Sequence, residues 1–511
     1  MLSPNYEKLS RINVPISPNP KSAIAAFLLL SLPLSYPAIA ARGGDVNKLQ
    51  ETKECPECNL QEANLMGAEL QGANLQASNL RLTNLRGAKL EGANLSRSLM
   101  RNVDLREANL AGANLDSANI GDGKLADANL FRASLENANL ENAQLQNANL
   151  TSANLQQAKL KDAQLNNANL QQANLANANL AEANLTNASL KNADLTNTNL
   201  QKVNLEYASL EGANLSGANF AEATFLQTNL NQSIIDEQTI LNDKSRFLWQ
   251  VVNLPLSGQT LTHQDLSGAF LEGMNLQGIN LQGTNLESAS LFAANLEGAY
   301  LRNSNLANAY LHYADLTAAN MQGVNLQAAD VRHGILVGAN LSEANLADAN
   351  LLDADLTNSN LLAANLENTQ LGGVNLSGAN LGKANIRQIQ INPQTTIDGQ
   401  WLLVLELIRE GAENRDLTDA NLFQANLQGV NFAGARLSGV NLSGANLSEA
   451  NLENAHLFEA NLQDADLQGA NLAGANLGEA NLSGANLQEA TLRNAYFCRT
   501  IMPDGSVSGC E

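Results

Sequence analysis

The chain has 511 residues and a net charge of −21, and only 15% of its residues are charged and 4% aromatic. Soluble globular domains usually contain about a quarter charged residues, whereas disordered chains contain far fewer hydrophobic residues than the 44% found here. With 4 His and 4 Cys and no hydrolase, phosphate-loop or metalloprotease motif, the composition argues against an enzyme and favours a narrow, regular core of Leu and Ala.

The first 40 residues predict an export signal. Basic residues precede an apolar stretch at residues 23–34, and Ala38-Ile39-Ala40 fits the small-x-small rule for signal cleavage. The stretch is shorter than the ~20 residues that a membrane-spanning helix needs. We therefore expect residues 1–40 to be a cleaved signal peptide, with no membrane span left after cleavage. The mature protein would lie in the periplasm, in the thylakoid lumen or outside the cell; an uncleaved anchor is the alternative.

From residue 60 onward, an apolar residue recurs at every fifth position. The unit reads A-N-L-x-x, as in Ala63-Asn64-Leu65. A five-residue period matches neither a straight helix nor a strand, but it suits a solenoid with one short strand and one turn per unit. The regular runs predict three solenoid segments, at residues 60–230, 266–391 and 417–497.

This pattern resembles the pentapeptide-repeat family over about residues 59–497. The resemblance implies an all-β solenoid, a right-handed quadrilateral β-helix in which four units make one square coil. The stretches around Cys55 and Cys498 look like the ends of cyanobacterial members. The residues agree with this fold: Leu and Ala would point inward, and Gly, Asn and Asp at the x positions tolerate the positive φ of tight turns. The Asn before each Leu would face outward and stack on its copy in the next coil, ~4.8 Å away.

Two interruptions separate the segments, and two short regions flank them. The interruptions, residues 231–265 and 392–416, lack the five-residue period, and both contain a Gln-Thr pair before an apolar stretch. The spacing within these stretches predicts a short helix in each insert. Each helix would cover a coil end, and a ligand role for the two Trp residues of the inserts is the alternative. The flanking regions are expected to be an N-terminal cap at residues 41–59 and a C-terminal cap or tail at residues 498–511.

The four cysteines form two pairs by position. Cys55 and Cys58 precede the first segment, whereas Cys498 and Cys510 follow the last one. Stacked coils at ~4.8 Å spacing would form a rod roughly 95 Å long, which is too long for one zinc site to join the pairs. For an exported protein we expect a disulfide within each pair, with free buried thiols as the alternative. We expect no metal and no cofactor.

One face of the second segment carries an unusual set of outward side chains. Residues 20 positions apart would stack on successive coils, and the face with Leu291 and Leu311 is rich in aromatic and His residues. The set predicts a patch that binds a protein or a polymer. Surface drift is one alternative, and metal binding by His312, His333 and Asp330 is another. The predicted patch consists of Phe270, Phe292, Tyr310, His312, Tyr313, Asp330, Arg332, His333 and Leu352.

We therefore expect a non-catalytic, exported repeat protein that acts as a rigid scaffold for a protein or polymer partner. The alternative is a cytoplasmic inhibitor that mimics DNA and binds a DNA-binding enzyme such as a type II topoisomerase, as the family resemblance suggests. Duplex DNA carries one charge per ~1.7 Å, or about 56 charges over the length of this rod. Because the chain has a net charge of only −21, the acidic surface is better explained by solubility, and no nucleic-acid partner is expected.

Overall fold

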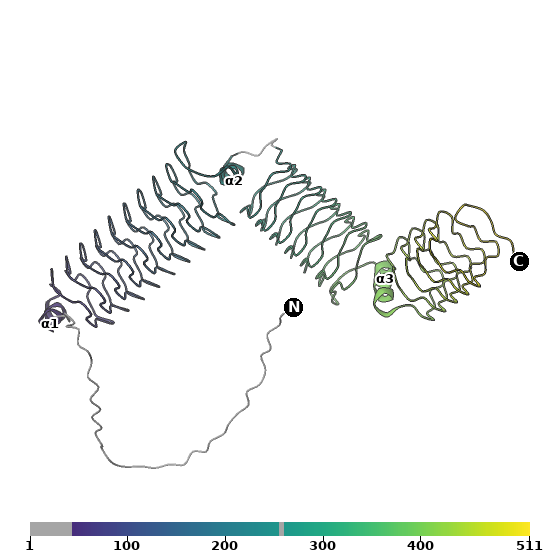
Figure 1. The fold of residues 1–511 in the computed structure, drawn as a ribbon, viewed down its shortest axis with the longest axis horizontal. Helices are drawn as coiled ribbons and strands as arrows, with labels where there is room; N and C mark the ends of the chain where they lie inside the picture. The colour runs from purple at the N-terminus through teal and green to yellow at the C-terminus, as the bar shows by residue number, and fades with distance from the viewer. Residues whose placement is uncertain (1–42, 255–259, 511) are drawn as a thin grey trace, which may run out of the picture. The chain divides into compact units, whose positions relative to one another are not determined.

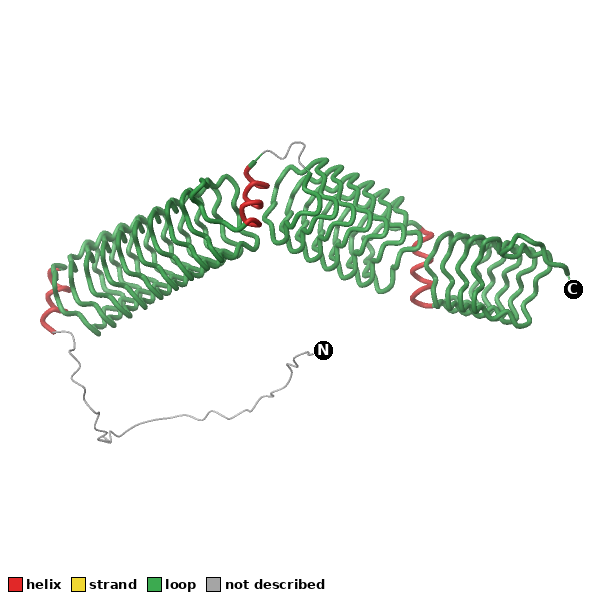
Figure 2. Tube along the Cα trace, turned by 45° about the horizontal axis from the view of Figure 1, so that its top comes forward, coloured by secondary structure: helices red, strands yellow, loops and turns green. Residues whose placement is uncertain are grey.

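The computed structural model describes residues 43–254 and 260–510. The predicted signal peptide lies outside the described residues. Figure 1 and Figure 2 show that most of the described chain winds into stacked coils. The β structure of the described residues consists of single-residue bridges, all parallel except the one between Ile501 and Val507. The coils are therefore held together by many short pairings between neighbours in the stack.

Each coil contains four five-residue units, because the bridge residue of one unit pairs with the residue 20 positions later. Asn64 pairs with Asn84, and Asn84 pairs in turn with Asp104. Two backbone hydrogen bonds accompany this bridge: Leu65 N donates to Asn84 O at 2.7 Å, and Asn84 N donates to Ala63 O at 2.9 Å. The backbone groups of one coil are thus satisfied by the coils on either side.

The interior of each coil contains the central Leu and the Ala two positions before it. Leu170 and Ala168 are typical, with 0% and 1% of their surface exposed. One large and one small side chain from each side of the coil are buried in the narrow interior, where such side chains pack closely. Where Thr or Ser replaces Ala, the hydroxyl can donate to a backbone acceptor, as Thr198 Oγ1 does to Leu175 O at 2.9 Å, whereas Ser359 Oγ is buried without a partner among the described residues. The A-x-L spacing thus accounts for the packing.

The two positions after each central residue form a corner of the coil. The second of them has a positive φ, such as 59° at Asn167 and 68° at Gly217, which Asn and Gly tolerate better than most residues. The Asn before each Leu supports this corner. Asn149 Oδ1 accepts a hydrogen bond from Thr151 N at 3.2 Å, and Asn149 Nδ2 donates to Asn129 Oδ1 of the neighbouring coil at 3.0 Å. These contacts explain why Asn recurs at this position.

The coils extend beyond the predicted ends of the first two segments. The repeat pattern places these ends at residues 230 and 391, but the last bridges join Asn219 to Ile240 and Asn375 to Thr396. Each of these bridges spans one residue more than the others. The coil therefore keeps its hydrogen bonds although one unit contains an extra residue and the five-residue period ends. Bridges also begin before the predicted starts at residues 60 and 266, with Glu54 and Thr260 as their first residues.

The described residues contain three helices, and Figure 1 shows where each meets the coils. Leu49 of the first helix is fully buried against the first coils. The second helix begins after Asn242, whose side chain accepts a hydrogen bond from Ser245 N, and the third is capped after its last residue by Gly411, which has a φ of 74°. None of the three is long and apolar enough to cross a membrane. Their bounds are Gly43–Thr52 for α1, Asp243–Asn253 for α2 and Gly399–Glu410 for α3.

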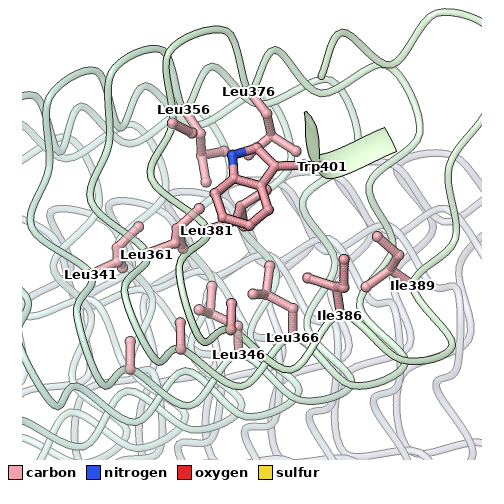
Figure 3. Packing of buried hydrophobic residues seen from close by; sticks show 14 of the residues in the cluster. Leu341, Leu346, Leu356, Leu361, Leu366, Leu376, Leu381, Ile386, Ile389 and Trp401 are labelled. Carbon is pink, nitrogen blue, oxygen red and sulfur yellow. The ribbon is translucent and has the colours of Figure 1, made fainter. Parts of the chain in front are cut away.

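The regions around α2 and α3 connect the three segments, and we call them the first joint and the second joint. At the first joint the core is divided: Leu248 and Val251 of α2 belong to the apolar cluster of the second segment, whereas Trp249 packs against the cluster of the first segment. At the second joint one cluster continues from the second segment through α3 into the third. Figure 3 shows Trp401 of α3 among leucines of this cluster.

Candidate binding surface

The predicted patch residues lie in three neighbouring columns on the second segment. Tyr310 and Asp330 are consecutive members of a column of bridge residues. The next column holds Phe292, His312 and Arg332, which occupy the first corner position of successive coils. The third column holds the second corner position, where Tyr313 and His333 have φ values of 60° and 53°. The regular coil thus places side chains from distant parts of the sequence side by side.

Four rings of the patch contact one another. The rings of His312 and Tyr313 stack with centroids 4.2 Å apart, and His333 stacks on both, at 5.2 and 5.0 Å. Phe292 meets His312 and Tyr313 edge-on, at 5.8 and 6.0 Å. Such offset and edge-to-face pairs are favourable geometries for aromatic rings. The four side chains therefore form one continuous, ordered cluster.

An ion pair lies next to the rings. Arg332 donates two hydrogen bonds to the carboxylate of Asp330, from Nε at 2.8 Å and from Nη2 at 2.6 Å. The hydrogen bonds from this guanidinium lower the pKa of Asp330, although partial burial opposes the shift. The carboxylate therefore stays charged at neutral pH and holds the guanidinium in a fixed orientation.

The rings are accessible, although one nitrogen beneath them is not. The side chains of Phe292, Tyr310 and Tyr313 are 41%, 48% and 53% exposed, so a partner can reach them directly. His312 Nε2 is buried and has no hydrogen-bond partner in the described part of the chain. A buried polar atom without a partner costs free energy, and such atoms call for an explanation in a native structure.

The structure does not bring every predicted patch residue into the ring cluster. Phe270 lies at the first joint, where it lines a small space together with Leu248 and Val252 of α2. It is partly covered because α2 occupies the gap between the two segments. Leu352 lies one coil beyond Arg332, close to Gly372. These two residues therefore belong to the edges of the face.

We name the remaining set the aromatic–histidine surface. It consists of Phe292, Tyr310, His312, Tyr313, Asp330, Arg332 and His333. The sequence did not single out Asp353, whose Oδ2 lies 4.0 Å from His333 Nδ1. Asp353 follows His333 by one coil in the same corner column, so the 20-residue spacing is the signal that could have found it.

The geometry of the two His residues does not suit the metal alternative. The planes of the His312 and His333 rings lie 24° apart and stack face to face, and Arg332 occupies the carboxylate of Asp330. Within residues 43–254 and 260–510, no group of three or more His, Cys, Asp or Glu is arranged to hold a metal ion.

The four cysteines lie at the two ends of the coiled region. Cys55 is joined to Cys58 and Cys498 to Cys510, with Cα atoms 5.4 and 4.2 Å apart. Cys55 is fully buried beside Leu49 of α1 in the first apolar cluster. The first disulfide thus lies in the N-terminal cap, and the second ties the end of the chain to its last coil.

The coils and their outward columns define a class of protein, a four-sided solenoid of parallel five-residue units. Its family follows from the sequence profiles. The profile of the pentapeptide repeat region matches residues 158–240. The profile of pentapeptide repeats matches residues 55–81, 83–122, 128–163, 256–291, 289–327, 325–362, 363–389, 416–454, 435–472 and 465–502. Together these matches cover well over half of the chain, which therefore belongs to the pentapeptide repeat family.

Solved structures of other family members are similar to parts of the chain. HetL, a protein involved in heterocyst differentiation regulation in the cyanobacterium Nostoc sp. strain PCC 7120, is 29% identical, with 52% of this chain and 98% of HetL covered and a TM-score of 0.23. A protein from the thylakoid lumen of Arabidopsis thaliana is 23% identical, with 27% and 77% covered and a TM-score of 0.18. QnrB1, a plasmid-mediated fluoroquinolone resistance protein, is 14% identical, with 38% and 95% covered and a TM-score of 0.21. No curated protein matches the chain.

Proposed function

We propose that the protein is an exported, non-catalytic scaffold that holds a protein or polymer partner on its aromatic–histidine surface. The observation that carries the proposal is the contact among Phe292, His312, Tyr313 and His333 on an accessible face. Aromatic and Arg side chains dominate the binding energy of interfaces. Here they gather in a chain of which only 4% is aromatic.

The rigidity of the coils supports this role. The backbone beneath the rings is hydrogen-bonded on both sides, as Ala293 N is to His312 O at 2.9 Å and Tyr313 N is to Arg332 O at 3.1 Å. Binding to a prepared surface costs less conformational entropy than binding to a mobile one. The rings lie along one side of the stack, where a long or broad partner can contact several coils at once. A protein or polymer therefore suits the surface better than a small molecule, which prefers a concave site.

Export is the second part of the proposal. The signal-like pattern of residues 1–40 supports it. The two disulfides are consistent with it, because disulfides persist in oxidising compartments. Mass spectrometry of the native protein should find its amino end at or near Ala41. A cytoplasmic form that keeps Met1 would contradict export and favour the DNA-mimic alternative.

Site-specific photo-crosslinking tests the surface in the native envelope. A photoreactive phenylalanine in place of Tyr310 should form a covalent product with the partner. The same group in place of Tyr300, which is 55% exposed but lies outside the aromatic–histidine surface, is the matched control. A product from both positions, or from neither, would contradict the proposed binding surface.

Two double variants then measure how much the rings contribute. Replacing Phe292 and Tyr313 with Ala should weaken binding of the identified partner more than tenfold, a loss of ~1.4 kcal/mol. The control replaces Tyr300 and Phe423, which are also exposed, and should leave the affinity within twofold. Equal losses in the two variants would mean that the partner binds elsewhere.

A further inference from the structure

The two joints follow the same plan where the coils end. Thr239 Oγ1 donates to Leu215 O at 3.0 Å, and Thr395 Oγ1 donates to Leu371 O at 2.7 Å. Each Thr is followed, after the same number of residues, by the first residue of α2 or α3. The difference in residue number between Thr239 and Thr395 can therefore be added to any residue number of the first joint to find its counterpart in the second.

The joints also match where the coils resume. At the first joint Gln227 N donates across the gap to Gly268 O at 2.7 Å, and at the second Lys383 N donates to Gln424 O at 2.6 Å. These two contacts have the same spacing and are related by the same separation. In both joints, a corner of the last coil before the helix is thus hydrogen-bonded directly to a corner of a coil after the helix. Differences in side chains at matched positions can therefore be compared one to one.

One matched position differs sharply in size. Ser245 of α2 corresponds to Trp401 of α3. Trp401 is 7% exposed, and Figure 3 shows its indole beside Leu381 and other leucines. Ser245 instead lines a pocket of about 490 Å³. Phe225, the counterpart of Leu381, lines the same pocket, so the pocket borders the region that corresponds to the indole at the second joint.

The pocket has an apolar wall and an acidic rim. Phe225, Leu226 and Leu248 line it, and so do Glu206 and Glu287. Neither Glu forms an ion pair with a described residue, whereas many other carboxylates of the chain do. Its volume falls within the range of small-molecule sites, about 300–1,000 Å³, which typically combine apolar walls with a few polar groups.

The one basic residue in the pocket wall is already neutralised. Lys244 Nζ lies 2.9 Å from Asp265 Oδ2 and donates a hydrogen bond to Ser267 Oγ at 2.6 Å. The net charge that faces the pocket is therefore negative, and it comes from Glu206 and Glu287. An anionic ligand would be repelled, whereas a cation would gain from both carboxylates.

We propose that the pocket of the first joint binds a small organic cation that carries a flat apolar ring, an arylalkylammonium ion. The ring would lie against Phe225 and Leu248, next to the position that corresponds to the Trp401 indole at the second joint. The ammonium group would lie near Glu206 and Glu287. This site is separate from the aromatic–histidine surface and does not depend on the function proposed for it.

Calorimetric titration of the full chain with tryptamine tests the proposal, since tryptamine joins an indole to an ammonium group. At 150 mM salt and pH 7 we expect one saturable site per chain. Indole-3-propionate, which carries a carboxylate on the same ring, should bind more than tenfold more weakly. A dissociation constant of ~1 mM corresponds to a binding free energy of only about 4 kcal/mol. If tryptamine does not bind even at this concentration, the proposal is overturned.

Three variants locate the site. Ser245→Trp copies the second joint and should weaken tryptamine binding more than tenfold without lowering the melting temperature. Replacing Glu206 and Glu287 together with Gln should weaken tryptamine binding more than tenfold but leave the binding of neutral indole unchanged. Glu367→Gln removes an exposed carboxylate elsewhere and should change nothing.

The variants also distinguish binding of tryptamine in the pocket from non-specific binding to the acidic surface of the protein. Binding that persists in Ser245→Trp would show that tryptamine associates with other carboxylates, and it would overturn the proposal. Circular dichroism checks that Ser245→Trp is folded. If it is not, the double Gln variant decides alone, and unchanged tryptamine affinity in that variant would equally overturn the proposal.

Discussion

Lys244 and Asp265 form an ion pair of 2.9 Å that connects the first turn of α2 to an early coil of the second segment. Partial burial raises the pKa of Asp265, but the hydrogen bonds from Lys244 and Ser267 outweigh it and lower the pKa to about 2. A carboxyl group whose pKa is lowered on folding stabilises the folded state above its unfolded pKa of ~3.9. That stabilisation is lost as the pH falls from there towards 2.

This relationship predicts a pH-dependent attachment of α2. Amide exchange in α2 should be faster in Asp265→Asn than in the parent at pH 7, and the difference should vanish near pH 2. Both partners are about half exposed, at 40% and 54%, so solvent screening limits the effect at pH 7 to ~1 kcal/mol or less. Glu211→Gln, which breaks a partly exposed pair with Lys191, should not affect α2. Unchanged exchange of α2 in Asp265→Asn at pH 7 would contradict this prediction.

The stability of the coils should fall when a side chain of their interior is made either smaller or larger. Leu170→Ala should cost ~2–5 kcal/mol by leaving a cavity, and Ala168→Leu should cost ~1–3 kcal/mol by overfilling the coil. Gln171→Ala is the control, because its side chain is only half-buried and loses a single hydrogen bond to Ser189 Oγ, which is worth about 1 kcal/mol. Native-state hydrogen exchange of neighbouring coils measures each change. Equal costs for all three would mean that the inward and outward positions are assigned wrongly.

The two Trp residues should differ in what they contribute. Trp401→Ala should cost ~3–5 kcal/mol and loosen α3, because the indole is almost fully buried. Trp249→Phe keeps a ring but loses the hydrogen bonds from Nε1 to Ser233 O at 3.0 Å and to Ser233 Oγ at 3.1 Å, so ~1 kcal/mol is expected. Exchange rates of α2 and α3 report each joint separately. A larger effect of Trp249→Phe than of Trp401→Ala would contradict this assignment.

The C-terminal disulfide should act locally. Cys510→Ser should destabilise the turn in which Ile501 pairs antiparallel with Val507, since closing a loop of this size contributes ~3 kcal/mol. The coils around Leu170 should be unaffected, because contacts in a solenoid reach only to nearest neighbours. Hydrogen exchange of both regions, with and without reductant, gives the comparison. Loss of protection around Leu170 would show that the solenoid unfolds as a whole.

The coils could be predicted from the sequence because their cause is periodic. Leu and Ala at fixed positions in each unit can bury themselves together only if each unit forms one side of a coil. The coil ends could not be predicted in this way. Thr239 and Thr395 hold the last coils through hydroxyl hydrogen bonds, and the extra residue before them removes the period while the bridges remain. The handedness of the coils stays a prediction from the family resemblance.

The candidate surface could be predicted only in part. Spacing placed Phe292, His312 and Arg332 in one column, but it did not reveal that four rings touch, because contact depends on side-chain rotamers. Phe270 seemed equivalent by spacing, yet α2 partly covers it. The pocket was missed altogether. Superposing the Gln-Thr pairs of the two inserts would have placed Ser245 opposite Trp401 and indicated a difference in volume.

The matched joints make the stretch between them a module. It starts and ends in the same geometry, so deleting residues 240–395 would join Thr239 to Thr396 with the hydrogen-bonding partners of the last coil still correctly placed. The shortened chain would carry α3 where α2 was, with Trp401 at the position of Ser245. A duplicated module would lengthen the chain by the same principle, adding a second aromatic–histidine surface at a fixed number of coils from the first. Such a chain could thus change the number and spacing of its aromatic–histidine surfaces by copying whole modules, without any change to the packing inside a coil.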